Sequence, residues 1–160
     1  MENGNKTVTD SDRDFVRRAI ALAWRSAGHT RPNPPVGAVV VKDGAVIGEG
    51  RHRRCGGDHA EVAALKACRR SPEGATVYVT LEPCSRAGRV GACCDALRAA
   101  GVRRVVWACR DPNPVNRGRA ARILRRAGIE TSGGVCADEA EPLIRPFAKH
   151  IATGLPFVTV

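Results

Sequence analysis

Four residues, His59, Glu61, Cys84 and Cys93, form the part of the sequence that is best equipped for chemistry. One imidazole and two thiolates are the nitrogen and sulfur ligands that zinc prefers in tetrahedral sites. Three protein ligands leave a fourth position for water, and zinc lowers the pKa of that water to about 7. Glu61 follows His59 by two residues, so we expect it beside the metal, as an acid and base that transfers a proton.

Local patterns place these residues at the ends of predicted elements. His59 and Cys93 each open a predicted helix, and Cys84 follows a predicted strand. Helix N-termini favour the thiolate form of cysteine. The predicted helices are one that begins at Asp10 and is ended by Gly28, and others over 59–70, 93–100, 119–127 and 137–153; the predicted strands cover 36–41, 45–50, 75–81, 103–109 and 129–131.

Alternation of helical and extended patterns predicts one α/β domain around a layered sheet. Residues 1–9 are expected as a flexible tail and residues 10–160 as the domain. Lys42-Asp43-Gly44, between two short apolar runs, predicts a β-hairpin. Hydrophobic residues make up 43% of the chain, enough for a packed core, which excludes a disordered protein.

Charge and cysteine content restrict the partners and the compartment. The net charge is +10, and residues 51–126 alone carry 17 basic and 6 acidic residues. Such a surface attracts phosphate groups, either on a polymer or on a small anion. The equal alternative is that these basic residues are simply exposed to solvent and bind no partner. No run approaches roughly 18 apolar residues, and the N-terminus lacks a signal-peptide pattern. We therefore expect a cytoplasmic protein without a membrane partner, whose seven cysteines serve metal binding or burial rather than disulfides.

Several motifs, in one order, resemble the riboflavin-biosynthesis pyrimidine deaminases, which belong to the cytidine deaminase-like zinc superfamily. A His-x-Glu motif with a later Pro-Cys pair is typical of zinc deaminases, but eight residues separate Cys84 from Cys93, whereas nucleic-acid deaminases have Cys-x-x-Cys. The resemblance covers most of residues 12–160. Its motifs are Arg31-Pro32-Asn33-Pro34, Gly50-Arg51-His52, His59-Ala60-Glu61, Thr80-Leu81-Glu82-Pro83-Cys84-Ser85, Gly88-Arg89 and Asp111-Pro112-Asn113-Pro114.

This resemblance implies a three-layer α/β/α fold with a central mixed sheet of about five strands. It implies a Zn²⁺ cofactor on His59, Cys84 and Cys93, and Glu61 as the proton carrier. The implied reaction is hydrolytic deamination of 2,5-diamino-6-ribosylamino-4(3H)-pyrimidinone 5′-phosphate to the dione and ammonia. The expected substrate contacts are Asn33 and His52 at the base, Arg89, Asp111 and Asn113 at the ribose phosphate, and in addition Ala60 and Arg86.

The resemblance also implies partners. Deaminases of this fold generally form dimers or tetramers, so a homo-oligomer is expected. Bifunctional relatives carry a reductase domain after the deaminase, and this chain ends where that domain would begin. A stand-alone deaminase with a separate reductase as a candidate partner is therefore expected.

Three loop positions depart from the family pattern. Arg86 stands where a histidine is usual, Val90-Gly91-Ala92 replace Thr-Pro-Pro, and Asn116-Arg117 replace a small apolar pair. All three lie in loops expected around the substrate, while the metal ligand set is complete. Deamination is therefore expected to survive, and the identity of the substrate is the open point.

Alternatives remain for individual residues. His52 could be a packed strand-end histidine, and Asn33, Asp111 and Asn113 could serve turns or caps. Solvated side chains are the alternative for the two arginines, Arg86 and Arg89. Cys94 could replace its neighbour as a ligand but is expected to be buried, and the remaining cysteines, Cys55, Cys68, Cys109 and Cys136, are expected to act as small apolar residues or loop thiols.

Rival functions also remain. The same chemistry could act on a modified pyrimidine or related heterocycle of secondary metabolism. A nucleic-acid deaminase, for instance one for tRNA adenosine, is favoured by the basic middle but opposed by the long cysteine spacing and the few aromatic residues. A zinc-stabilised binding domain without catalysis is opposed by the presence of Glu61 and of every ligand.

Overall fold

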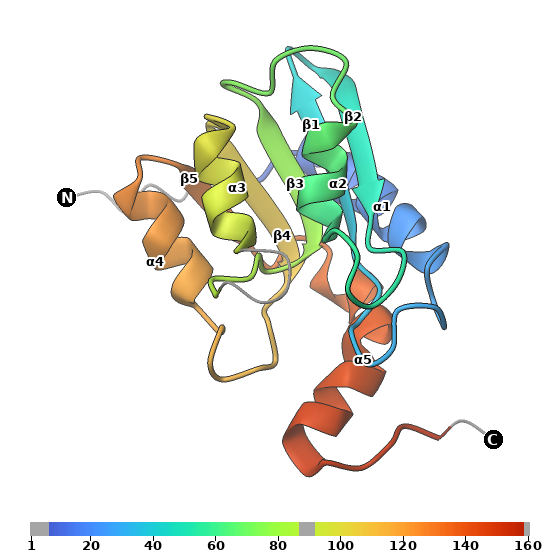
Figure 1. Cartoon of the computed structure of the whole chain (residues 1–160). Coiled ribbons are helices and arrows are strands. Elements are labelled where there is room, and N and C mark those ends of the chain that lie inside the picture. The colour runs from blue at the N-terminus through green and yellow to red at the C-terminus, as the bar shows by residue number, and fades with distance from the viewer. Residues whose placement is uncertain (1–6, 87–91, 159–160) are drawn as a thin grey trace.

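A five-stranded mixed sheet forms the centre of the computed structural model, which describes residues 7–86 and 92–158 (Figure 1). The strands are β1 (Gly37–Lys42), β2 (Ala45–Arg51), β3 (Thr76–Leu81), β4 (Arg104–Cys109) and β5 (Glu130–Gly133). Their order is β2-β1-β3-β4-β5, in which β1 is antiparallel to both its neighbours and β3, β4 and β5 are parallel. The expected mixed sheet is confirmed.

Helices cover both faces of this sheet: α1 (Asp10–Trp24), α2 (Ala60–Lys66), α3 (Cys93–Ala99), α4 (Arg119–Arg126) and α5 (Ala137–Thr153). Successive strand residues point to opposite faces. Val39 and Val106 therefore join the apolar cluster under α1 and α5, whereas Val40 and Val105 join the cluster under α2, α3 and α4. Figure 1 shows the latter three helices on the face of the sheet toward the viewer. The three-layer α/β/α architecture is confirmed.

The hairpin of β1 and β2 carries α2 at close range. Asp43 and Gly44 both have positive φ angles, 51° and 74°, as the predicted two-residue turn requires. A Cβ atom on Gly50 would lie 2.2 Å from the backbone nitrogen of Ala64, so only glycine lets α2 approach β2 this closely. The backbone contact fixes the height of α2, and of His59 at its start, above the sheet.

Two predicted helices are too long. The helix expected over 59–70 ends at Lys66, because the amide of Arg69 donates to the carbonyl of Ile47 at 2.9 Å and so joins the edge of β2. The first helix ends at Trp24, and turns follow before Gly28. The strand expected over 129–131 is β5 at Glu130–Gly133 instead.

The two ends of the described chain differ in how they contact the rest of the fold. Thr9 caps α1 through a reciprocal capping box with Asp12, and Val8 packs against the core, whereas residues 1–6 lie outside the described residues. The C-terminal helix α5 runs through Pro142 and Pro146 as predicted, and its second half extends beyond the sheet (Figure 1). Among the described residues, no helix has the length and apolar character needed to cross a membrane.

Candidate active site and metal centre

Three side chains from three elements meet at one end of the sheet. His59 is the N-cap of α2, Cys93 is the first residue of α3, and Cys84 follows β3. The Nδ1 atom of His59 lies 3.1 Å from Sγ of Cys93 and 3.5 Å from Sγ of Cys84, and all three atoms lie within 4.8 Å of one another. Tetrahedral zinc with bonds of about 2.0 Å to nitrogen and 2.3 Å to sulfur needs ligand atoms roughly 3.5 Å apart. The cluster therefore fits a zinc ion.

Hydrogen bonds stabilise the anionic form of one of these thiols. The Cys93 thiol and His59 hydrogen-bond to the sulfur of Cys84, and the backbone amide of Cys93 donates to it at 3.2 Å. These contacts, that from the Cys93 thiol above all, lower the pKa of Cys84 to about 4. The hydrogen bond with Cys84 also raises the pKa of His59. A thiolate is the form of cysteine that binds metal, so the cluster is prepared for a cation.

Glu61 lies in the first turn of α2, beside the cluster. Its side chain is buried, and burial raises its pKa to about 7, with a hydrogen bond from Cys93 opposing that rise. A carboxyl group with a pKa near the working pH is suited to both accepting and donating a proton. The geometry therefore supports the proton-transfer role that the sequence predicts for Glu61.

A cavity of about 300 Å³ opens beside the cluster and is lined by His59, Glu61 and Cys84. Five of the seven predicted substrate contacts also line it, namely Asn33, His52, Ala60, Asp111 and Asn113. Arg86 is exposed and is not part of this lining, and Arg89 lies outside the described residues. The structure thus brings together residues that are separated by as many as 80 positions in the chain.

Two of the predicted contacts support one another. The Nδ1 atom of His52 lies 2.9 Å from the carbonyl oxygen of Asp58, which only accepts hydrogen bonds, so Nδ1 carries a proton. The Nε2 atom then accepts from the side-chain amide of Asn33 at 3.2 Å. This orientation of Asn33 leaves its carbonyl oxygen and second amide hydrogen for a ligand.

Other residues of the cavity were not predicted as site residues. Asn116 donates from Nδ2 to Asp111 at 3.1 Å and accepts from the hydroxyl of Ser85 at 3.1 Å. In the sequence, only the departure of Asn116 from the family pattern indicated that this residue could lie at the site. Phe147 and Ile151 reach the cavity from the projecting half of α5. Their spacing of four residues indicates one face of a helix, but not what that face covers.

The remaining cysteines are not members of the cluster, although the backbone amide of Cys94 donates to the carbonyl oxygen of Cys84 at 3.2 Å. Cys94 is buried as expected, and burial raises the pKa of its thiol to about 12, so that it stays protonated. Cys109 and Cys136 are buried, Cys68 is partly buried, and Cys55 is exposed.

Replacing Cys93 by alanine is expected to reduce the zinc content to less than about a tenth of that of the unchanged chain, because two ligands hold zinc much less tightly than three. Metal analysis after gel filtration measures this content. Cys94→Ala is the matched control, and it is expected to keep its zinc. Equal losses in both variants would contradict the assignment of Cys93 as the ligand.

Comparisons with known proteins agree with this geometry. Residues 9–109 match the family described as the cytidine and deoxycytidylate deaminase zinc-binding region. The riboflavin biosynthesis protein RibD of Escherichia coli (strain K12) is 51% identical over 147 residues, which are 92% of this chain and 40% of that protein. The diaminohydroxyphosphoribosylamino-pyrimidine deaminase of Buchnera aphidicola subsp. Schizaphis graminum is 39% identical over 145 residues, which are 91% of this chain and 99% of that protein.

The fold is shared as well. The solved diaminohydroxyphosphoribosylaminopyrimidine deaminase/5-amino-6-(5-phosphoribosylamino)uracil reductase of Thermotoga maritima has a TM-score of 0.88 and 43% identity, over 92% of this chain and 43% of that one. The chain thus spans less than half the length of the Escherichia coli and Thermotoga maritima proteins, but nearly the whole length of the Buchnera deaminase. The matched region of the family model contains His59, Glu61, Cys84 and Cys93. The chain therefore belongs to the cytidine and deoxycytidylate deaminase zinc-binding family.

Proposed function

We propose that this chain catalyses hydrolytic deamination of a phosphoribosylated diaminopyrimidine, of the type 2,5-diamino-6-ribosylamino-4(3H)-pyrimidinone 5′-phosphate, to the dione and ammonia. The observation that carries the proposal is one cavity that joins the metal-binding cluster, the buried Glu61 and the polar pair Asn33 and His52. The name of the Buchnera relative, almost all of whose length this chain covers, supports the choice of substrate.

The proposed roles follow from the positions of the side chains. His59, Cys84 and Cys93 would hold zinc, which would supply a Lewis acid that makes water more acidic. Glu61 takes a proton at its carboxylate and delivers it to the departing nitrogen. In the proposed deamination, the ring carbon that carries the amine forms a bond to the oxygen of water. Its bond to the amine nitrogen breaks, and the amine leaves as ammonia.

Substrate orientation is assigned to the polar lining. Asn33, held by His52, offers a donor and an acceptor to the pyrimidine ring. Asp111 and Asn113 are proposed to face the ribose phosphate, together with Arg89. The carboxylate of Asp111 accepts from the amide of Asn113 at 2.9 Å, and Oδ1 of Asn113 accepts from the amide of Val115 at 3.1 Å, so the NH₂ group of Asn113 is the part available to a ligand.

Partners and compartment belong to the same proposal. We propose a homodimer or tetramer in the cytoplasm that works with a separate reductase, which would consume the deaminated product. The two activities named for the Thermotoga protein support a reductase as the next enzyme. Arg86, which is exposed and lies outside the cavity lining, stays proposed as a substrate contact on the family resemblance alone.

Mass spectrometry of the zinc-loaded chain incubated with the diaminopyrimidinone ribotide tests this function. The expected product has one amine replaced by oxygen, with ammonia released in equal amount and conversion stopped by a chelator. No conversion by a folded, zinc-loaded sample would overturn the proposed substrate. Unphosphorylated and modified pyrimidines would then be assayed, and tRNA after them.

A further inference from the structure

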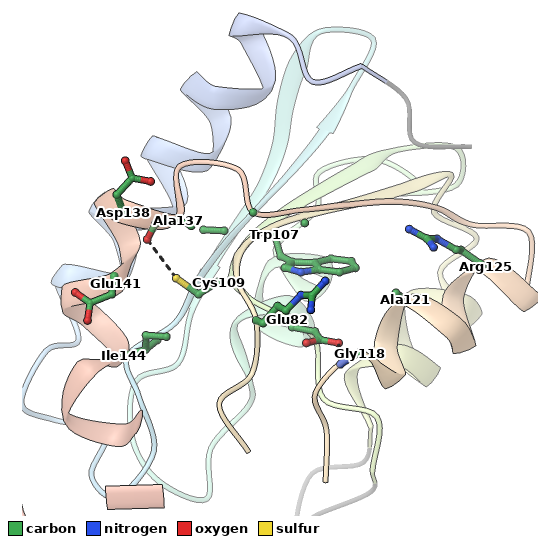
Figure 2. Close-up of a pocket in the computed structure, with 14 residues that line it drawn as sticks. Glu82, Trp107, Cys109, Gly118, Ala121, Arg125, Ala137, Asp138, Glu141 and Ile144 are labelled. Atoms are coloured by element: carbon green, nitrogen blue, oxygen red, sulfur yellow. Dashed lines mark hydrogen bonds between the residues drawn. The ribbon is translucent and has the colours of Figure 1, made fainter. Parts of the chain in front are cut away.

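Glu82 is a buried carboxylate that touches both ends of one loop. It follows β3, and its side chain is 2% exposed. Its Oε1 atom accepts from the backbone amide of Gly118 at 2.8 Å, and its Oε2 atom accepts from the backbone amide of Asp111 at 3.2 Å. In Figure 2 the carboxylate points toward Gly118, just before α4 begins. One side chain thus holds the first and last residues of the segment 111–118.

That segment provides part of the candidate active site. Asp111, Asn113 and Asn116 all line the cavity beside the metal-binding cluster. Their side chains depend on the path of the loop backbone, since the amides of Asn113 and Val115 are bonded within the loop itself. A displacement of either end of the loop therefore moves polar groups of the cavity.

A second contact joins the same two segments. The Ser85 hydroxyl donates to Asn116, which in turn donates to Asp111. Ser85 is the neighbour of the candidate ligand Cys84, so the chain leaving β3 carries a metal ligand and also two anchors for the loop. These contacts fix the position of the polar cavity residues of segment 111–118 relative to the metal-binding cluster.

We propose that Glu82 is a positioning residue for the deamination, which acts by holding segment 111–118 against the chain that carries Cys84. Glu82 also lines the cavity, but each of its carboxylate oxygens accepts a hydrogen bond from a backbone amide of the loop, so the role assigned to it is to hold the loop. The proposal rests on the proposed function for its catalytic meaning, but the anchoring of the loop is measured separately.

The surroundings of Glu82 provide a sharp test. Glu82 also lines a second, broad pocket of about 1140 Å³ that lies between α4 and α5 and includes Trp107, Gly118 and Asp138 (Figure 2). Removing the side chain in Glu82→Ala would open the position of the carboxylate to this pocket. Formate or acetate could then enter and accept hydrogen bonds from the same two amides. Glutamine cannot replace both acceptors, because its NH₂ group would face an N–H donor.

Glu82→Ala and Glu82→Gln are expected to raise KM for the ribotide at least about tenfold, with a smaller change in kcat, because the loop is assigned to binding of the ribose phosphate. Added formate or acetate is expected to recover much of the loss in Glu82→Ala but not in Glu82→Gln. Hydrogen exchange is expected to show lost protection at the amides of Asp111 and Gly118, with β4 unchanged. Asp138→Asn, in the same pocket, is the control and should match the unchanged chain in every readout.

The outcomes separate the two proposals. If the unchanged chain deaminates the ribotide and both Glu82 variants keep its KM and its amide protection, the positioning role is overturned. Lost protection throughout the chain, or loss of zinc, would show a general structural role and would also overturn it. If the unchanged chain does not act on the ribotide, the proposed function fails, and the exchange of the Asp111 and Gly118 amides still decides whether Glu82 anchors the loop. Glu82→Gln, which preserves side-chain size, supplies this answer if the alanine variant does not fold.

Discussion

Replacing Glu61 by glutamine is expected to lower kcat by about 100- to 10,000-fold, the usual contribution of a positioned acid and base. Glutamine has nearly the same size and fits the same buried space in the first turn of α2. Its amide cannot take up a proton, so the transfer to the departing amine loses its carrier. The measurement is the rate of product formation by zinc-loaded protein at saturating substrate.

Zinc content and a matched variant make this result specific. Glu61→Gln is expected to bind as much zinc as the unchanged chain, because the predicted ligands are His59, Cys84 and Cys93. Glu73→Gln, an exposed acid away from the cavity, is the control and should keep full activity. Unchanged turnover in Glu61→Gln would remove the proton-transfer role, and loss of zinc would place Glu61 among the ligands instead.

The second large effect concerns stability and a buried ion pair. Asp12 of α1 is 3% exposed, and its Oδ1 atom accepts from the Tyr78 hydroxyl at 2.7 Å and from the Arg104 guanidinium at 2.9 Å. The other oxygen accepts from the amide of Thr9 at 2.9 Å. Arg104 also donates to Ser132 at 3.2 Å. This network connects α1 with three strands of the sheet.

Asp12→Asn is expected to lower the free energy of unfolding by about 3–5 kcal/mol, because the positive charge of Arg104 would remain buried without its partner. Urea unfolding followed by circular dichroism measures the loss. Asp14→Asn, on the same helix but exposed, is the control and should change stability little. Equal unfolding midpoints for the two variants would contradict the importance of the buried pair.

The same pair predicts how stability depends on pH. Burial alone would raise the pKa of Asp12, but the hydrogen bonds from Thr9 and Tyr78 and the charge of Arg104 bring it below its ordinary value. A depressed pKa in the folded state stabilises the fold at pH values above the unfolded pKa of about 3.9, and this contribution is lost as the pH falls through the folded value. The unchanged chain should therefore lose stability below about pH 4 more steeply than Asp12→Asn.

Much of the fold followed from local sequence patterns. The alternation of helices and strands, the turn at Asp43-Gly44 and the position of α5 depend on residues close together in the chain, and the structure confirms them. The end of α2 did not follow, because the bond between Arg69 and Ile47 depends on a strand more than 20 positions earlier. Helical periodicity reports only on neighbouring residues, so it cannot predict a hydrogen bond to a distant strand that ends the helix.

The candidate site divides in the same way. The residue types of His59, Glu61, Cys84 and Cys93, and their positions at the ends of elements, already predicted a zinc site with an acid beside it. Only the tertiary structure decided that Phe147 and Ile151 of α5 and Asn116 would line its cavity, and that Glu82 would bond to the backbone of a distant loop. Ligand chemistry is a property of side-chain type, and so it can be read from the chain. The walls of a cavity are set by how separate elements pack, and that packing depends on contacts between residues far apart in sequence.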